Sequence, residues 1–147
     1  MLLARIMHML THNCNLGSQR DDPLAAAILV ELAAMEGATE ARYAPAIEHA
    51  QAALAMAGRL GDAALSARAA LALANTIARA DGPLPARPLL EQALAAALAG
   101  DDLTLAAEVS ASLSNSYYWT GELRRSHEFG LRRLEIAERG GHVFGLR

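Results

Sequence analysis

At 147 residues, the chain has the length of one ordinary domain, and 53% of its residues are hydrophobic. Ala accounts for 34 residues and Val for only three, a balance that favours helices over strands. The formal net charge is −3 and there is no Lys, which argues against direct nucleic-acid binding and excludes a Walker P-loop or a Schiff-base Lys within this chain.

The first predicted element is a leading helix within residues 1–20, covering about 2–16. Its opening letters, MLLARIMHML, are interrupted by Arg5 and His8, and no small-residue cleavage site follows at once, so they do not predict a secretion signal. No later apolar run has the length of a membrane span, and the single Cys, Cys14, excludes an intramolecular disulfide. We therefore expect an amphipathic helix at the start of a cytoplasmic protein with no membrane segment.

The rest of the chain repeats with a period of 40 residues. Sliding it against itself by 40 aligns Asp22 with Asp62 and Asp102, with His142 next in the column. Asp occurs only six times, so three in one register indicate a repeat rather than chance. A second column holds Leu at the same spacing: Leu54, Leu94 and Leu134. The units span residues 22–60, 62–100 and 102–140, and residues 142–147 open a truncated next helix.

Each unit predicts two helices. The Asp is the N-cap of the first helix, because its carboxylate can accept unpaired backbone N–H groups and suits the positive end of the helix dipole. The predicted first helices cover 23–36, 63–80 and 103–119. Turns follow at EGATE, ADGPLP and TGE, where Gly and Pro interrupt the helices. The predicted second helices cover 41–59, 84–99 and 122–139, and each ends near a Gly.

A motif within residues 113–134 indicates the kind of repeat. A Leu is followed by a small residue, an aromatic four positions after the Leu, a Gly eight after it, another small residue and a closing Leu: Leu113, Ser114, Tyr117, Gly121, Ser126 and Leu134. The preceding unit has Leu73, Ala74, Ile77, Ala86, Ala93 and Leu94 in its own version of the pattern. This motif resembles the tetratricopeptide repeat, in which large residues of one helix insert beside small residues of the next.

The resemblance implies an all-α fold, a right-handed superhelical solenoid of antiparallel helix hairpins. The chain departs from the usual pattern because its period is 40 rather than 34 and because Gly37 stands where an aromatic is expected. HEAT-like repeats, whose period is also about 40, are the structural alternative. Long units rich in Ala and Arg are similar to those of MalT-like, LuxR-type bacterial regulators and related signal-transducing ATPases. We therefore expect a fragment of a larger protein.

In a tetratricopeptide superhelix the first helices line the concave, partner-binding face. The residues expected on that face are Arg68, Asn75, Arg79, Glu108, Asn115, Tyr118 and Trp119. An Asn side chain offers both donor and acceptor, which suits an extended peptide backbone. Tyr and Trp supply rigid contact area, and Arg can pair with a carboxylate. The alternative interpretation is that these are ordinary polar residues of an exposed helix face.

Two other clusters have a simpler interpretation than a binding site. His8 and His12 share a helix face, but nothing supplies a fourth metal ligand, and Cys14 falls in the Leu column as a buried thiol, so we predict no metal site. The last full helix carries five Arg residues: Arg124, Arg125, Arg132, Arg133 and Arg139. Glu128 and Glu135 each lie four residues before an Arg, which predicts a solvated face with ion pairs. Binding of a phosphate or an acidic partner is the alternative.

The sequence contains no G-x-S-x-G elbow, no H-E-x-x-H and no Gly-rich phosphate loop. We therefore expect a binding module rather than an enzyme, with no cofactor. The predicted function is a protein-interaction or sensor segment of a bacterial regulator, with a protein or peptide partner on the concave face. The alternatives are self-association into a homo-oligomer, and a small ligand beside Trp119 that serves an attached enzymatic domain.

Overall fold

A computed structural model describes residues 21–39 and 42–141, and all regular structure within them is helical, as the composition predicts. The helices of this part are α2 (Pro23–Thr39), α3 (Tyr43–Leu60), α4 (Ala63–Asp81), α5 (Pro83–Ala99), α6 (Leu103–Trp119) and α7 (Leu123–Arg139). None of them is long and apolar enough to cross a membrane. The leading helix predicted in residues 1–20 and the truncated helix predicted at 142–147 lie outside the described residues.

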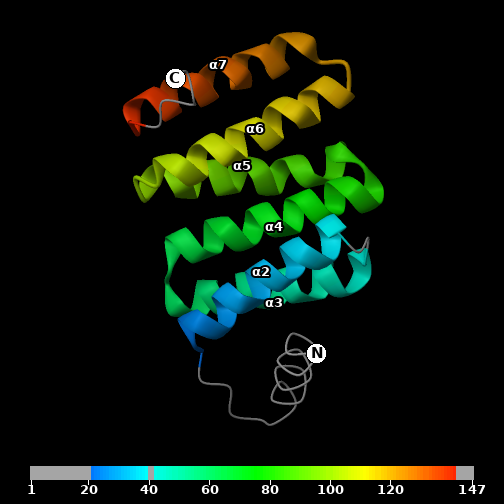
Figure 1. Cartoon of the computed structure of the whole chain (residues 1–147), viewed down its shortest axis with the longest axis vertical. Coiled ribbons are helices and arrows are strands. Elements are labelled where there is room, and N and C mark those ends of the chain that lie inside the picture. Colours follow the sequence, from blue (N-terminus) through cyan, green and yellow to red (C-terminus); the bar gives the residue numbers. More distant parts are fainter. Residues whose placement is uncertain (1–20, 40–41, 142–147) are drawn as a thin grey trace.

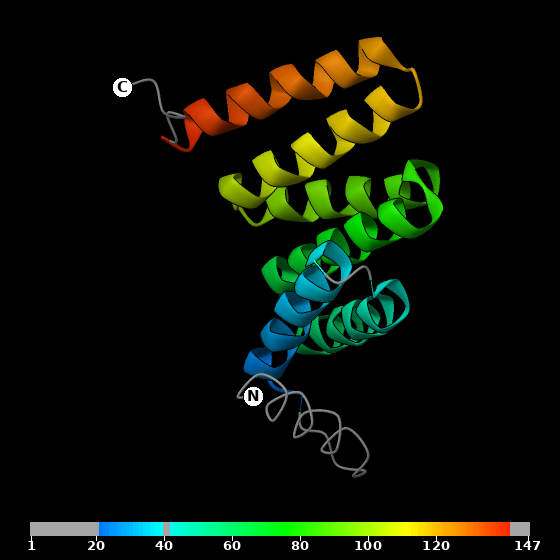
Figure 2. The same ribbon diagram turned by 45° about the vertical axis from the view of Figure 1, so that its right-hand side comes forward.

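The helices form three antiparallel hairpins, α2–α3, α4–α5 and α6–α7, which follow one another along the long axis of the molecule (Figure 1). Each helix packs against the next one in the chain. The first helices of the hairpins also pack against one another, α2 on α4 and α4 on α6, whereas in the described part no such contact joins α3 to α5 or α5 to α7. The order of the hairpins is equally clear from a second direction (Figure 2).

The three Asp residues of the 40-residue column lie at the start of the first helices. The backbone N–H of Leu65 donates to Asp62 Oδ1 at 2.9 Å, and the N–H of Leu105 donates to Asp102 Oδ1 at 3.0 Å. Asp22 Oδ1 likewise accepts from a backbone N–H in the first turn of α2, at 2.9 Å. These bonds satisfy N–H groups that have no partner inside the helix. These capping bonds therefore explain why each first helix begins directly after its Asp.

One predicted turn lies in a different place. The segment EGATE was expected to end its helix at residue 36, but α2 continues through Gly37 to Thr39. Gly37 is buried, and a Cβ there would lie only 2.8 Å from Thr76 Oγ1 of α4. The missing side chain thus lets α2 and α4 approach closely. The Gly that the sequence indicates as a helix terminator is instead a packing residue inside the helix.

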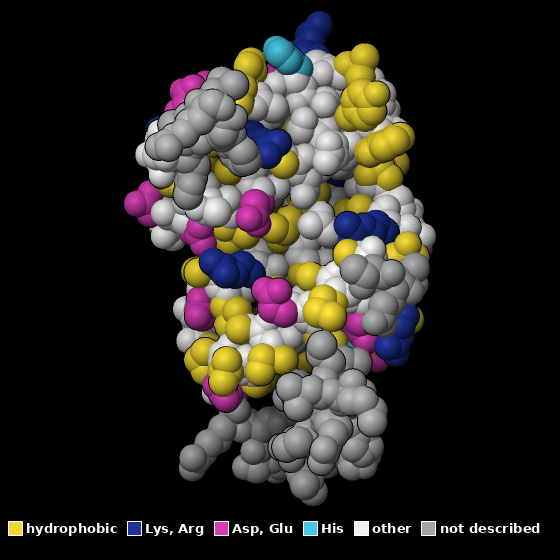
Figure 3. All heavy atoms as spheres, in the orientation of Figure 1, with side chains coloured by type: hydrophobic (Ala, Val, Ile, Leu, Met, Phe, Trp, Pro, Cys, Tyr) yellow, Lys and Arg dark blue, Asp and Glu magenta, His cyan; other side chains and the backbone are white. Residues whose placement is uncertain are grey.

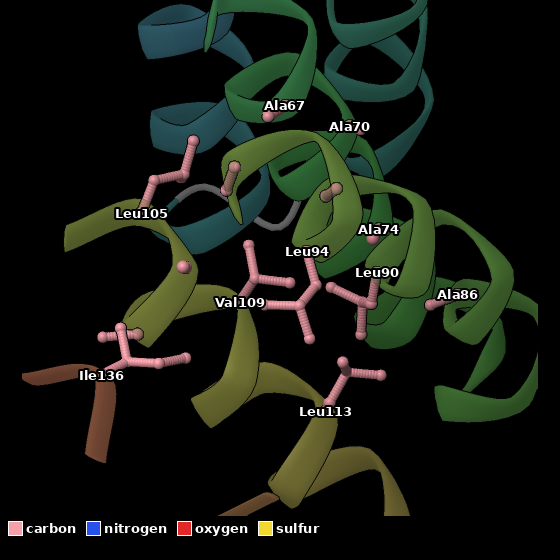
Figure 4. Close-up of a cluster of buried hydrophobic side chains, with 14 of the residues drawn as sticks. Ala67, Ala70, Ala74, Ala86, Leu90, Leu94, Leu105, Val109, Leu113 and Ile136 are labelled. Carbon is pink, nitrogen blue, oxygen red and sulfur yellow. The ribbon is translucent and has the colours of Figure 1, made fainter. Parts of the chain in front are cut away.

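The core is built from large residues inserted beside Ala. The largest cluster joins α4, α5, α6 and α7, with Leu90, Val109 and Leu113 each no more than 2% exposed. Figure 4 shows Leu90 beside Ala74 and Ala86, with Val109 and Leu113 facing it from α6. Because Ala occupies little space, neighbouring helices can approach closely enough for an Ala-rich chain to form a packed core.

Candidate functional site

Two adjoining grooves lie on the face that includes α2, α4 and α6. The larger, here the Trp119 groove, has a volume of about 520 Å³ and is lined by Asn75, Ala78, Arg79, Pro83, Leu90, Ser112, Asn115, Ser116 and Trp119. The smaller, here the Glu108 groove, has a volume of about 300 Å³ and is lined by Val30, Glu31, Ala34, Arg68, Leu71, Ala72, Asn75, Thr104, Leu105 and Glu108. Asn75 lines both, so the two grooves meet at this side chain.

Helix periodicity explains which predicted residues face the grooves. Asn75 and Arg79 lie four residues apart on α4, and Asn115 and Trp119 lie four apart on α6, so each pair shares one side of its helix. All four line the Trp119 groove, while Arg68 and Glu108, also predicted, line the Glu108 groove. The structure therefore brings six of the seven predicted residues to this face.

Tyr118, the seventh, lines neither groove. It is 59% exposed and meets the Trp119 ring edge-on, with the ring centroids 5.6 Å apart and the planes at 78°. Consecutive helix residues point about 100° apart, which places the Tyr118 side chain on a different side of α6 from Trp119. Trp119 is the more exposed of the two, at 76%.

The groove side chains are available to a ligand. Within the described residues, Asn75, Arg79 and Asn115 make no side-chain hydrogen bond or ion pair. The charges of the two grooves differ in sign: Arg79 is the charged residue of the Trp119 groove, whereas the Glu108 groove contains Glu31 and Glu108 with a single Arg. That Arg, Arg68, is already 3.7 Å from the carboxylate of Asp102. One end of the combined groove therefore favours a negative group and the other a positive group.

Beneath the Trp119 groove, Arg87 of α5 holds the last turn of α6. Its Nε donates to Ser116 Oγ at 3.1 Å, Nη2 donates to Thr120 Oγ1, and Nη1 lies 2.8 Å from Glu122 Oε1. The Arg87 guanidinium, followed by the Thr120 hydroxyl, lowers the pKa of the Glu122 carboxyl although partial burial opposes this shift. Sequence reasoning missed Arg87, because its partners lie 29 or more residues away along the chain.

A second cluster missed by sequence reasoning joins α2 to α3. The carboxylate of Glu36 is buried, and His49 Nδ1 lies 2.8 Å from its Oε2. Arg42 Nη1 lies 3.5 Å from its Oε1. His49 lies 13 residues from Glu36 along the chain, and no local sequence pattern signals a contact over that separation. This cluster therefore joins Glu36, near the end of α2, to Arg42 and to His49 of α3.

The predicted ion pairs of the Arg-rich helix are not formed. Within the described part of the chain, no contact of 4.0 Å or less joins Glu128 to Arg132 or Glu135 to Arg139. Such exposed pairs contribute only a few tenths of a kcal/mol, too little to hold two long side chains in one geometry. Arg125 instead donates from Nη1 to the Tyr117 hydroxyl at 3.4 Å, which is the main reason its pKa is raised.

Within residues 21–39 and 42–141, no group of three His, Cys, Asp or Glu side chains is placed to hold a metal ion. His8, His12 and Cys14, which were predicted not to form a metal site, lie outside the described residues. No family model, curated protein or solved structure matches the chain. The function is therefore argued from the geometry of the grooves.

Proposed function

We propose that this chain is a tetratricopeptide-like solenoid, a right-handed superhelix of helix hairpins, that binds an extended peptide of a partner protein along the α2–α4–α6 face. Contacts between the first helices, without matching contacts between the second helices in the described residues, support a stack that curves with α2, α4 and α6 on its inner side. Such a concave face is the usual binding surface of repeat proteins.

The observation that carries the proposal is the pair of Asn75 and Asn115. They occupy matching positions one 40-residue period apart, both line the Trp119 groove, and neither side chain is used within the described fold. Each amide can donate to and accept from a peptide backbone, which itself presents N–H and C=O groups along its length. Two such amides in one groove can therefore hold a peptide in a fixed register without depending on its side chains.

The remaining groove residues determine which way along the grooves the peptide chain runs. Arg79 supplies a charge for a peptide carboxylate, and Trp119 offers a rigid apolar surface for a large side chain. Glu31 and Glu108 suit a basic side chain at the other end. We therefore expect a peptide with an acidic group beside a large apolar residue and with a basic residue farther along.

The volume of the Trp119 groove, about 520 Å³, also falls in the range of small-molecule sites. A peptide is favoured because the two grooves meet at Asn75 and together form a longer path than one small ligand needs. The repeats' similarity to those of LuxR-type bacterial regulators supports a role in regulation, in which peptide binding biases the state of attached domains.

The test uses Trp119, the only Trp in the chain, as a reporter. Peptides selected from a display library of random short sequences are titrated into the full chain, and Trp119 emission is followed. Replacing both Asn75 and Asn115 with Ala should weaken binding about tenfold or more. The matched control replaces two exposed amides of the second helices, Gln51→Ala with Gln92→Ala, and should leave binding unchanged.

Two results would count against this function. If the Asn75→Ala/Asn115→Ala variant bound the selected peptides as tightly as the unaltered chain, the amide pair would not be the peptide clamp. If a thermal-shift screen found a sugar or nucleotide that stabilises the chain and blocks peptide binding through Trp119, the small-ligand alternative would replace the peptide.

A further inference from the structure

The last described hairpin, α6–α7, carries a third groove, here the end groove, with a volume of about 370 Å³. It is lined by Ala111, Ser114, Asn115, His127, Gly130, Leu131, Arg133 and Leu134. Two large apolar side chains of its lining, Leu131 and Leu134, are 48% and 56% exposed, and Tyr118 and Leu123 of the same hairpin are 59% and 60% exposed. Hydrophobic side chains are also seen gathered near the turn that joins α6 to α7 (Figure 3).

The exposed leucines form a stripe on one side of α7. Leu123, Leu131 and Leu134 recur at intervals of eight and three residues, which places them on the same side of a helix. The residues of α7 that belong to the core cluster lie on a different side and include Ile136 and Phe129, which stacks on Tyr117 of α6. The helix therefore has two apolar sides, and only one of them is used within the described fold.

The internal repeat shows what covers this kind of surface elsewhere in the chain. Forty residues before Leu134 and Ser114 lie Leu94 and Ala74, which are 5% and 0% exposed. They are buried because α6 lies on the α4–α5 hairpin and belongs to the same core cluster. The side chains that α6 contributes to this cluster include Leu105, Val109 and Leu113, one from each successive turn (Figure 4).

We propose that the end groove binds an amphipathic α-helix of a partner protein, seated on α6–α7 as α6 is seated on α4–α5. The partner helix carries aliphatic side chains four residues apart, with small residues between them that allow close approach. Gly130 stands where the preceding hairpin has Leu90, so the groove has room for a side chain larger than the one α6 offers there. The end groove shares Asn115 with the Trp119 groove, but its apolar residues Leu131 and Leu134 belong to α7 and line neither groove of the α2–α4–α6 face.

A second copy of this chain is a poorer occupant than a partner. Stacking of one copy on another would require a first helix with its docking side free. In α2, the residues that match Val109 and Leu113 are Leu29 and Ala33, which are already 8% and 0% exposed. The matching sides of α4 and α6 are inside the stack. Self-association through the end groove is therefore an outcome that the test must distinguish.

The probe is a synthetic, fluorescein-labelled peptide with the chain's own α6 sequence, residues 101–120, titrated with the full-length chain and followed by fluorescence anisotropy. We expect saturable binding that weakens about tenfold or more when Leu131 and Leu134 are both replaced with Glu. Leu84→Glu is the matched control, because Leu84 is 60% exposed on α5 and away from the end groove. A peptide with Val109→Glu and Leu113→Glu should not bind.

Circular dichroism is used to verify that the variants keep their helices, and Leu134→Glu alone serves if the double variant does not fold. The proposal is overturned if the α6 peptide shows no saturable binding, or if Leu84→Glu weakens binding as much as the end-groove variants. It is also overturned if light scattering finds a dimer of the chain that Leu134→Glu dissociates, since a second copy would then occupy the groove.

Discussion

Arg87 lies over the ring of Tyr117, with its Cζ 4.0 Å from the ring centroid. Phe129 of α7 stacks on the same ring, with centroids 5.4 Å apart and planes at 11°. Tyr117 is only 2% exposed, and its hydroxyl reaches Glu91 of α5 at 3.3 Å. This single aromatic, the aromatic of the repeat motif, therefore connects α5, α6 and α7.

Replacing Arg87 with Ala should lower the free energy of unfolding by about 2 kcal/mol. The loss combines a partly buried cation–π contact with hydrogen bonds from a charged donor. Arg87→Lys should recover less than half of it, because an ammonium cannot reach Ser116, Thr120 and Glu122 together as the planar guanidinium does. Urea unfolding followed by circular dichroism measures both variants.

Arg132→Ala is the control for the Arg87 variants. Arg132 is exposed on α7 and forms no ion pair within the described residues. Its removal should change the unfolding free energy by no more than about 0.5 kcal/mol. If Arg87→Ala proved as mild as Arg132→Ala, the Arg87 network would contribute nothing measurable.

The lowered pKa of Glu122 predicts a pH-dependent contribution to stability. A carboxyl whose pKa falls on folding stabilises the protein above its ordinary value, near 4.5, and loses that contribution as the pH falls toward the folded value. Glu122→Gln should therefore be less stable than the unaltered chain near neutral pH, and the difference should shrink below about pH 4. Asp21, whose pKa is lowered by Arg59, is common to both proteins and cancels in the comparison.

Urea unfolding of the two proteins at several pH values gives this difference directly. A gap between Glu122→Gln and the unaltered chain that stayed constant from neutral to acidic pH would show that ionisation of Glu122 is not coupled to folding.

The helix starts could be predicted because their signals are local. Asp62 and Asp102 each accept a hydrogen bond from the backbone three residues ahead, so a short stretch of sequence contains the whole interaction. The predicted start of α4 at residue 63 matches the observed Ala63. The repeated period supports each predicted start, because Asp recurs at the same place in every unit.

Asp62→Ala should destabilise the chain by about 1 kcal/mol, because the N–H of Leu65 loses its acceptor at the start of α4. Asp62→Asn should retain most of the stability, since its side-chain oxygen can still accept this hydrogen bond. Thermal and urea unfolding of the pair separate capping from charge. Equal losses in both variants would mean that the negative charge, not the hydrogen bond, stabilises the helix.

The groove residues could be predicted only in part. The Asn column follows from the period, and Asn75 and Asn115 do line one groove. The sequence could not separate Trp119 from Tyr118, because the side of α6 that faces a groove depends on how α4 and α5 pack against it. Arg87 was not found for the same reason, since its partners come together only in the folded chain.

Gly37 shows how tertiary packing can reverse a local signal. In most sequences a Gly between two helical segments ends the first helix, yet here α2 runs through it because α4 crosses where a side chain would stand. Two periods later, in the third hairpin, the same position holds the buried Tyr117, so the repeat uses one site for either a large residue or a close helix contact. Only the structure reveals which neighbour requires the small residue.

Gly37→Ala should therefore destabilise the chain by about 1–3 kcal/mol, although Ala is the better helix former, because its Cβ would lie 2.8 Å from Thr76 Oγ1. In a Thr76→Ala background the obstacle is gone, and the same substitution should become neutral or stabilising by up to about 1 kcal/mol. Gly58→Ala is the matched control: Gly58 lies within α3 with no atom within 4 Å of an added Cβ, so it should stabilise the chain in either background. Urea unfolding of the double-mutant cycle measures these free energies. If Gly37→Ala still destabilised the chain in the Thr76→Ala background, the constraint would lie in the α2 backbone and not in the contact with Thr76.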